Sequence, residues 1–352
     1  MKTFSLRALS AATRQSRTGA SASTYATDLV HQTLARHGLV SEPGAARPGA
    51  SSGIADDLMA SFHTKPRQNT ALPDGATFTS DLFSCDEGAR RFMTYVPASA
   101  TEGLKGLVLM LHGCTQTPED FADGTRMNEW AEARRLVVIY PHQSRGENAQ
   151  SCWNWFRRGD QRRGRGEPAL LSSLATFAAA RHGIPHSAIF VAGLSAGGAM
   201  ALILGETYPE VFAAVGVHSG LPVGSAKDVP SAFSAMSGSP MPHVSEAVGH
   251  VARTIVLHGT ADSTVHRSNG EKIIQQVLQH GPRVTFQAED HGQIEGRAYS
   301  RCVTTDTAGA ALAEHWEIEG LGHAWSGGSR TGTYTDHTGP DASAEMIRFF
   351  LD

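Results

Sequence analysis

The stretch "AIFVAGLSAGGAMALIL" (residues 188–204) passes from one kind of pattern to another with almost no connecting chain. It opens on an apolar run typical of a buried strand and closes on a run typical of a buried helix rich in small side chains. Ser195 lies between the two runs, flanked by Gly193 and Gly197. In a Gly-x-Ser-x-Gly turn of this kind the serine oxygen projects above the sheet, and a side chain at either glycine would collide across the turn. The alternative is a Gly-rich connection with an incidental serine.

Strand and helix patterns alternate around this turn from about Ala76 to the C-terminus. Apolar strands separated by helices predict the α/β class, with a mostly parallel sheet covered on both faces. Besides the strand and helix of the quoted stretch, the strands are expected at residues 92–97, 107–113, 136–141, 213–220, 254–262 and 315–323, and the helices at residues 167–183, 268–280 and 341–351.

Length and composition exclude several classes of protein. The chain has 352 residues, of which 40% are hydrophobic, enough for one large α/β domain with an extension. Its net charge of −4 does not favour nucleic acid or an anionic membrane as a bulk partner. No apolar run approaches the roughly 18 residues that a membrane-spanning helix needs. The four cysteines show no CxxC or Cys/His metal spacing. The sequence predicts no metal and no organic cofactor.

The N-terminal part differs in composition from the rest. Residues 1–75 are expected to form an extension with a short helix at 24–37 and a Pro/Gly/Ser-rich linker at 41–75, while residues 76–352 form the catalytic domain. Arg7 interrupts the apolar part of the basic N-terminus before a secretory h-region can form. A cytoplasmic location is therefore favoured, with an extracellular or periplasmic one as the alternative.

Two further motifs supply the partners that a serine nucleophile needs. Asp262 in "HGTADSTV" and His323 in "GLGHAW" each follow a predicted strand, as Ser195 does. Ligands of parallel sheets bind beyond the carboxyl ends of the strands, so the three side chains are expected at one edge. A histidine that takes the serine proton and an acid that orients the histidine would make Ser195 a nucleophile. The alternatives are that Asp262 caps the next helix and that His266 is the base.

An oxyanion needs two backbone N–H donors aimed at the point where its charge develops. Ala196, the residue after the nucleophile, is expected to supply one. Cys114, in the "LHGCTQ" that ends an earlier strand, is expected to supply the other, with Thr115 as second choice. His112 and His258, each in an "LHG" at a strand end, are interpreted as hydrogen-bonded structural histidines.

Together these motifs resemble the esterase family of poly(3-hydroxybutyrate) depolymerases, and they are also similar to bacterial feruloyl and acetylxylan esterases. The resemblance covers the chain from about Ala76 to its end and implies an α/β-hydrolase fold and ester hydrolysis through an acyl-serine. It places Ser195, Asp262 and His323 at the nucleophile, acid and base, and Cys114 in the oxyanion loop. Secreted depolymerases of this kind also carry a signal peptide and a polymer-binding domain, for which the sequence shows no pattern. The motifs that carry the resemblance are "LHGCTQTPEDFADGTRMNEWAE", "YPHQS", "CWNWF", "GEPALL", "GLSAGGAM", "HSGLPVGSA", "HGTADSTVH" and "GLGHAWSGG".

Tryptophans gather in the loops expected beside the serine. Trp153 and Trp155 in "CWNWF", and Trp325 after the predicted base, are interpreted as an apolar wall for an acyl chain or ring, whereas Phe156 is assigned to the core. The arginine-rich segment that follows, residues 157–167, is interpreted as a solvated loop rather than a carboxylate site.

The cysteines allow a disulfide at the same edge. Cys114 and Cys152 both lie in loops expected there, so a bridge between them would hold the oxyanion donor against the tryptophan loop. Cys85 and Cys302 would then form a second pair by elimination. The alternative is that these cysteines remain reduced.

The sequence thus predicts a serine carboxylic-ester hydrolase, a monomer or weak dimer, that acts on poly- or oligo(3-hydroxyalkanoate) or related polyester bonds. Feruloyl, acetylxylan and short-chain carboxylic esters are the alternative substrates. A serine peptidase would use the same triad, but no clamp for a peptide terminus is recognised. A catalytically inactive binding module is the alternative of another class.

Overall fold

The computed structural model describes residues 72–239, 252–281 and 284–352. The expected N-terminal helix at 24–37 lies outside the described residues, and so does nearly all of the 1–75 extension. The predictions for residues 76–352 can be compared with the fold.

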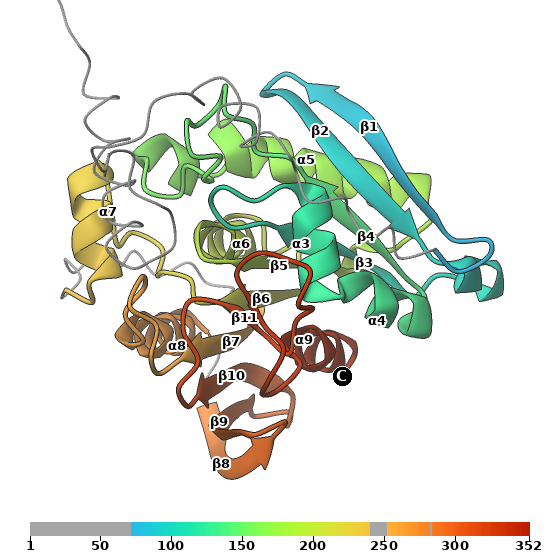
Figure 1. Cartoon of the computed structure of the whole chain (residues 1–352). Coiled ribbons are helices and arrows are strands. Elements are labelled where there is room, and N and C mark those ends of the chain that lie inside the picture. Colours follow the sequence, from blue (N-terminus) through green and yellow to red (C-terminus); the bar gives the residue numbers. More distant parts are fainter. Residues whose placement is uncertain (1–71, 240–251, 282–283) are drawn as a thin grey trace, which may run out of the picture. The chain divides into compact units, whose positions relative to one another are not determined.

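The described residues form a ten-stranded sheet with the order β1-β2-β4-β3-β5-β6-β7-β10-β9-β8 (Figure 1). The strands from β4 to β10 in that order run parallel, and antiparallel strands extend the sheet at both sides. A short pair, β11 with β12, stands apart from the main sheet. The strands are β1 (Thr77–Cys85), β2 (Gly88–Val96), β3 (Gly106–Leu111), β4 (Leu136–Pro141), β5 (Ile189–Leu194), β6 (Ala214–His218), β7 (Arg253–Gly259), β8 (Val284–Ile294), β9 (Arg297–Asp306), β10 (Ala311–Ile318), β11 (Trp325–Ser326) and β12 (Thr335–Asp336).

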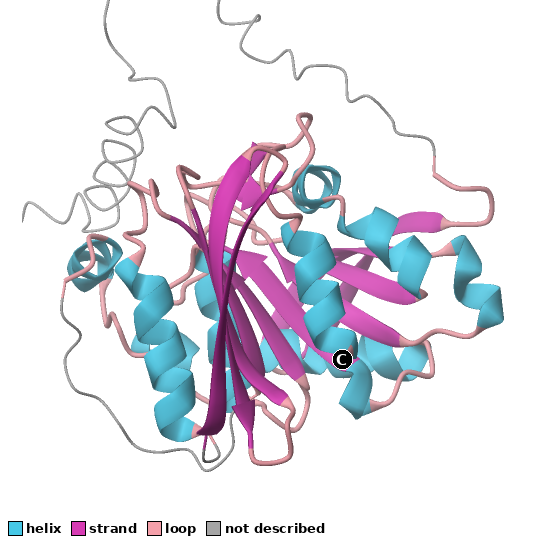
Figure 2. Cartoon of the chain, turned by 90° about the horizontal axis from the view of Figure 1, so that it is seen from below, coloured by secondary structure: helices cyan, strands magenta, loops and turns pink. Residues whose placement is uncertain are grey.

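Helices cover both faces of this sheet, as Figure 2 shows. The α-helices are α3 (Pro118–Thr125), α4 (Met127–Arg134), α5 (Gly166–Arg181), α6 (Ala196–Thr207), α7 (Val229–Met236), α8 (Ser268–His280) and α9 (Ala342–Leu351), with short 3₁₀ turns η1 (Ala98–Glu102), η2 (Arg158–Gln161) and η3 (His186–Ala188). Alternate residues of β3 enter two separate cores: Leu107 and Leu109 pack with α5, α6 and α8, while Val108 and Met110 pack with α3, α4 and α9. Because both faces are buried, strands β3, β4 and β5 are apolar throughout.

The prediction of an α/β-hydrolase fold is confirmed, and the central strands and the helices α5, α8 and α9 lie close to their expected positions. Strands β1, β8 and β9 were not predicted. Their side chains are largely exposed or half-buried, so they lack the apolar run that marked the central strands. Within the described ranges, no helix is both long and apolar enough to span a bilayer.

Candidate active site

Ser195 lies at a strained point between β5 and α6. Its φ of 58° and ψ of −118° are outside the regions that residues with a side chain favour, at a cost of about 1–3 kcal/mol. Its N–H donates to the carbonyl of His218, 2.9 Å away on the neighbouring strand β6, which holds the turn against the sheet. The residue is only half-buried, so its hydroxyl is accessible at the edge of the sheet.

The two glycines around Ser195 are required by close backbone contacts. A Cβ on Gly193 would stand 2.4 Å from the carbonyl carbon of Gly197. A Cβ on Gly197 would stand 2.0 Å from the carbonyl oxygen of Leu111 at the end of β3. Real contacts of that kind do not occur below about 3 Å, so the sequence pattern Gly-x-Ser-x-Gly follows from the packing of α6 on β5 and β3.

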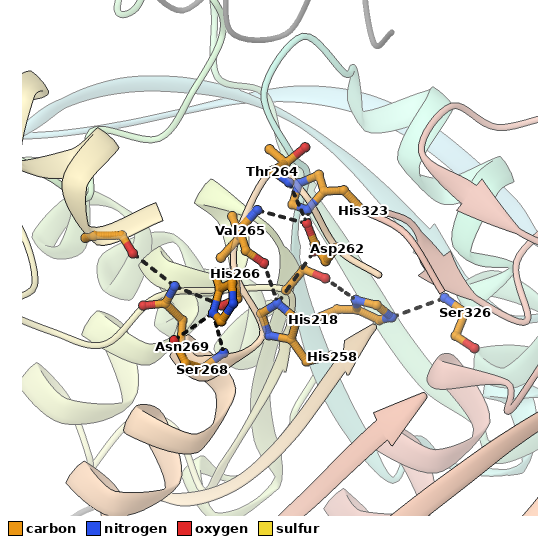
Figure 3. A network of polar contacts seen from close by, with 12 residues as sticks. His218, His258, Asp262, Thr264, Val265, His266, Ser268, Asn269, His323 and Ser326 are labelled. Atoms are coloured by element: carbon orange, nitrogen blue, oxygen red, sulfur yellow. Dashed lines mark hydrogen bonds and ion pairs between the residues drawn. The ribbon is translucent and has the colours of Figure 1, made fainter. Parts of the chain in front are cut away.

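Asp262 follows β7 and its carboxylate is fully buried and fully hydrogen-bonded (Figure 3). Oδ1 accepts the N–H groups of Thr264 (2.9 Å) and Val265 (2.8 Å), and Oδ2 accepts from Nδ1 of His323 (2.8 Å). Burial alone would raise the pKa of Asp262, but the facing His323 and the hydrogen bonds from the histidines lower it below its ordinary value. Asp262 is therefore a fixed anion that orients one imidazole.

His323 has its tautomer set by that contact. A carboxylate oxygen only accepts, so the hydrogen lies on Nδ1 and the lone pair on Nε2. The loop that carries His323 packs directly on the end of β7, where a Cβ on Gly259 would stand 2.1 Å from the carbonyl oxygen of Leu321. The hydrogen bonds within the described residues join His323 to Asp262 and include none between His323 and the hydroxyl of Ser195. Such a bond is often long in a free enzyme and tightens when substrate binds.

The rival assignments for acid and base are not supported. His266 is exposed, and its Nδ1 contacts Oγ of Ser268 at 2.9 Å. Asp262 caps its own loop through Thr264 and Val265 and also holds His323, so it does more than begin the next helix.

In the predicted oxyanion loop, residues 113–116, one backbone N–H is left without an acceptor among the described residues. The N–H of Gly113 donates to Oε1 of Gln116 (2.9 Å), and that of Thr115 donates to the carbonyl of Gln150 (2.8 Å). Within the described residues, the N–H of Cys114 between them has no acceptor. The N–H of Ala196 begins α6 and so has no acceptor within that helix. Thr115, the second choice for the donor, is already engaged.

Strained backbone gathers in the loops around these residues. Five non-glycine residues with positive φ lie at Ser195, in the loops that carry Cys114 and Cys152, after β6, or in the loop after His323. Conformations of this kind cost energy and are found mainly where function requires them. These residues are Thr115 (66°), Ser151 (50°), Ser195 (58°), Ser219 (51°) and Tyr334 (52°).

A disulfide joins Cys114 to Cys152, with the Cα atoms 4.2 Å apart. It ties the oxyanion loop to the loop that carries Trp153 and Trp155. The expected second bridge was wrong: Cys85 and Cys302 are free thiols. Cys85 ends β1 at one side of the sheet and Cys302 lies in β9 near the other, so the whole parallel core separates them. The prediction of a bond between Cys85 and Cys302 was made without knowledge of the strand order.

We expect removal of this disulfide to lower stability. The disulfide closes a loop between residues 38 positions apart and so limits the conformational entropy of the unfolded chain. A Cys114→Ser/Cys152→Ser double variant removes this limit, and we expect its unfolding free energy to fall by about 3–4 kcal/mol. Denaturant midpoints measured without reductant check this. A Cys85→Ser/Cys302→Ser variant serves as control and should shift by less than about 0.5 kcal/mol. Equal midpoints for both double variants would contradict the prediction.

The tryptophans lie deeper than expected. Trp153 and Trp325 are 0% exposed, and Trp155 is 6% exposed. The indole N–H of Trp153 donates to the carbonyl of His112 (3.0 Å), and that of Trp325 donates to Oγ of Ser343 (3.2 Å). Both rings have satisfied donors and belong to the core, so the prediction that they form a substrate wall is wrong for Trp153 and Trp325. An indole ring packs as well under a loop as beside a substrate, and the sequence pattern does not distinguish the two.

Buried polar side chains hold the loop that carries Trp153 and Trp155. The carboxylate of Glu167 accepts from the N–H (2.7 Å) and side-chain amide (2.7 Å) of Asn154 and from the side-chain amide of Gln143 (2.5 Å). Arg90 donates to Gln143 and lies over the ring of Trp153. Burial raises the pKa of Glu167. The motif "GEPALL" contains this glutamate, but no local pattern indicates its partners.

Three buried histidines surround the site as structural groups. Nε2 of His112 accepts the N–H of Gln143 (3.1 Å), and Nε2 of His258 donates to the carbonyl of Val265 (2.8 Å) and lies 3.5 Å from Oδ2 of Asp262. His218, which sequence reasoning missed, accepts the N–H of Ser326 (3.2 Å) and stacks on Trp325. Its place near the end of the expected strand 213–220 was the available signal. All three are shown to be hydrogen-bonded and fully buried.

These buried histidines predict a loss of stability on mild acidification. Burial lowers the pKa of His112 to about 4 and that of His218 to about 3, below the ordinary value near 6.5. Between pH 6.5 and 4 the unfolded chain binds more protons than the folded one, so the unfolding free energy falls as pH falls, by about 1 kcal/mol per pH unit for each histidine. Denaturant midpoints at pH 7.5 and 5.5 test this. A His218→Gln variant should show a smaller pH dependence; an unchanged one would contradict the assignment.

The arginine-rich segment is a surface loop. Its five arginines are all exposed, and Arg163 pairs with Glu210 over the ring of Tyr208. Gln161 bonds to the loop after β6 through the N–H of Gly224 and the carbonyl of Ala226. In the described part of the chain, no group of three or more His, Cys, Asp or Glu side chains is arranged to hold a metal ion.

Comparisons with known proteins identify a family and several relatives. Residues 91–288, more than half of the chain, match the family described as "Esterase PHB depolymerase". The chain is 31% identical over 255 residues to poly(3-hydroxyalkanoate) depolymerase C of Paucimonas lemoignei, which covers 68% of this chain and 60% of that protein. It is 28% identical to a poly(3-hydroxybutyrate) depolymerase of Ralstonia pickettii (69% of this chain, 54% of that protein). The chain thus spans somewhat over half the length of these two relatives.

Two other relatives are matched over more of their length. Feruloyl esterase B of Neurospora crassa is 28% identical over 254 residues, covering 66% of this chain and 82% of that protein. Among solved structures, an acetyl xylan esterase from Aspergillus awamori superposes with a TM-score of 0.60 at 19% identity, covering 78% of this chain and 98% of that one. That structural likeness supports the fold alone.

Proposed function

The chain belongs to the esterase PHB depolymerase family, and on that basis we propose that it is a serine carboxylic-ester hydrolase that works through an acyl-serine. The observation that carries the proposal is the buried Asp262–His323 pair, with Nε2 of His323 left as a base, at the same sheet edge as the strained Ser195. A chain that only bound ligands would not need a strained serine at the same sheet edge as an oriented base.

In the proposed reaction His323 takes the proton of Ser195 as its oxygen attacks the ester carbonyl. The imidazolium that forms is stabilised by Asp262, which holds its charge in a buried site. The N–H groups of Cys114 and Ala196 donate to the oxyanion of the tetrahedral intermediate. His323 then gives its proton to the departing alcohol, and the same groups activate a water that hydrolyses the acyl-serine. No metal or organic cofactor enters this scheme.

For the substrate we propose poly- or oligo(3-hydroxyalkanoate) esters, because the family and the first two relatives carry depolymerase names. Feruloyl and acetyl esters are the second candidate, since the feruloyl esterase is matched over 82% of its length whereas the depolymerases are matched over 60% and 54%.

Turnover on 3-hydroxybutyrate oligomers, ethyl ferulate and p-nitrophenyl acetate tests this choice. We expect the highest kcat/KM on the hydroxybutyrate oligomers, with p-nitrophenyl acetate as a general reporter of the triad. A higher kcat/KM on ethyl ferulate would favour the second candidate. No turnover on any of the three, and no labelling of Ser195 by an organophosphate, would favour an inactive binding module.

A further inference from the structure

Gln116 has no catalytic role in the proposed reaction, yet its side chain is buried close to the predicted oxyanion donor. Its side chain is 3% exposed and all its polar atoms are used. Oε1 accepts the N–H of Gly113 at 2.9 Å. Nε2 donates to Oδ2 of Asp120 (3.0 Å) and to the carbonyl (3.0 Å) and Oγ1 (3.2 Å) of Thr333. One buried carboxamide thus joins the oxyanion loop, the helix α3 and the segment after His323.

The bond to Gly113 decides which N–H is left for substrate. It takes the N–H just before that of Cys114, while Gln150 takes the one just after it. Because neighbouring peptide planes are joined through Cα, fixing both flanking N–H groups restricts the direction of the N–H of Cys114. The disulfide holds the side chain of the same residue. Gln116 therefore acts on the direction of the donor without touching substrate.

The hydrogen bonds from Gln116 to Asp120 and Thr333 hold the loop that carries Cys114 in place relative to His323, the proposed base. Asp120 also accepts the N–H of Thr333 (3.0 Å), so the two residues are joined independently of Gln116. Next to Thr333, the carbonyl of Tyr334 accepts the N–H of Trp325 (2.7 Å), which lies two residues after His323. Gln116 thus connects the oxyanion loop to the segment that carries the base through a short series of hydrogen bonds.

We propose that Gln116 is a positioning residue for the oxyanion donor. It directs the N–H of Cys114 and fixes the position of that N–H relative to His323. This inference rests on the proposed function. An oxyanion donor acts mainly in the transition state, so its misplacement lowers kcat rather than raising KM. Loss of one such donor typically costs about 10²–10³ in kcat, which is the upper limit for a variant that only misdirects it.

The first test replaces the carboxamide by a thioether of similar length. We expect Gln116→Met to lower kcat on p-nitrophenyl acetate by about 10- to 100-fold with KM nearly unchanged. The inhibition constant of an alkyl boronic acid, which binds as a tetrahedral anion, should rise by a similar factor. Gln276→Met is the matched control, because the carboxamide of Gln276 holds Val223 through its N–H and carbonyl (3.0 Å each) in another loop. That variant should keep both constants near wild type.

A charge exchange provides the second test. Gln116→Glu places a carboxylate against Asp120 and should lower kcat at least as much as Gln116→Met. Adding Asp120→Asn restores a donor–acceptor pair with reversed polarity and should recover most of kcat and of the boronate affinity. This rescue also separates positioning from a failure to fold, since both Gln116→Glu variants are monitored by thermal melting.

Three results would overturn the inference. They are a rise in KM without loss of kcat, a loss of kcat with unchanged boronate affinity, and an equal loss in the Gln276→Met control. A failure of the proposed function is distinct, because the wild-type protein would then show no turnover and no labelling of Ser195.

Discussion

Replacing Ser195 by alanine is expected to reduce kcat on a soluble ester by about 10⁶-fold, because no acyl intermediate can form without its oxygen. Stability should change little, since the hydroxyl makes no hydrogen bond among the described residues and alanine meets the same backbone strain at a φ of 58°. Steady-state kinetics with p-nitrophenyl acetate and a melting curve measure the two effects. An organophosphate should add one adduct to the wild-type chain and none to the variant.

Ser263→Ala serves as the control for this variant. Ser263 is exposed and lies beside Asp262, so it is the nearest serine in sequence to the predicted acid. Its replacement should leave kcat near wild type. If Ser195→Ala kept more than about a thousandth of the wild-type kcat with the fold intact, Ser195 would not be the nucleophile.

Replacing Asp262 by asparagine is expected to reduce kcat by about 10⁴-fold. The N–H groups of Thr264 and Val265 require an oxygen on their side, so the new amide nitrogen must face His323. Nδ1 of His323 would then have to accept, and its hydrogen would move to Nε2. The imidazole would present a donor to Ser195 where a base is needed.

The same kinetic assay checks this prediction, with Asp228→Asn as the control. Asp228 caps the N-terminus of α7 through the N–H of Ser231, and asparagine caps equally well. We expect that variant to keep wild-type kcat. A loss of less than tenfold in Asp262→Asn would mean that Asp262 does not set the tautomer of His323.

Much of the fold was predictable because burial leaves a local mark in the sequence. The central strands are mostly apolar, since both faces of the sheet are covered, and the expected strand 136–141 coincides with β4. The expected helix 268–280 coincides with α8, whose apolar side chains recur at helical spacing. Strands β1, β8 and β9 escaped prediction because their side chains are largely exposed or half-buried, so these segments lack a continuous apolar run.

Some features of the candidate site could be predicted from the sequence, and others depend on tertiary contacts. Ser195, Asp262 and His323 could be proposed from sequence because each follows an apolar strand and parallel strands end at one edge of the sheet. The roles of Gln116 and His218, and the free thiols of Cys85 and Cys302, could not. Each depends on which remote segments meet, and local periodicity carries no information about that.

The sequence by itself therefore determined the α/β class and the strained turn at Ser195, and it carries the proposed order of nucleophile, acid and base. Steric limits at glycine and the periodicity of buried strands act between near neighbours in the chain. Only the tertiary structure decided that Trp153 and Trp325 are core and that the N–H of Cys114 is the one left for an oxyanion. Burial of an aromatic ring and satisfaction of a backbone donor are set by atoms that arrive from other loops, and those contacts exist only once the chain has folded.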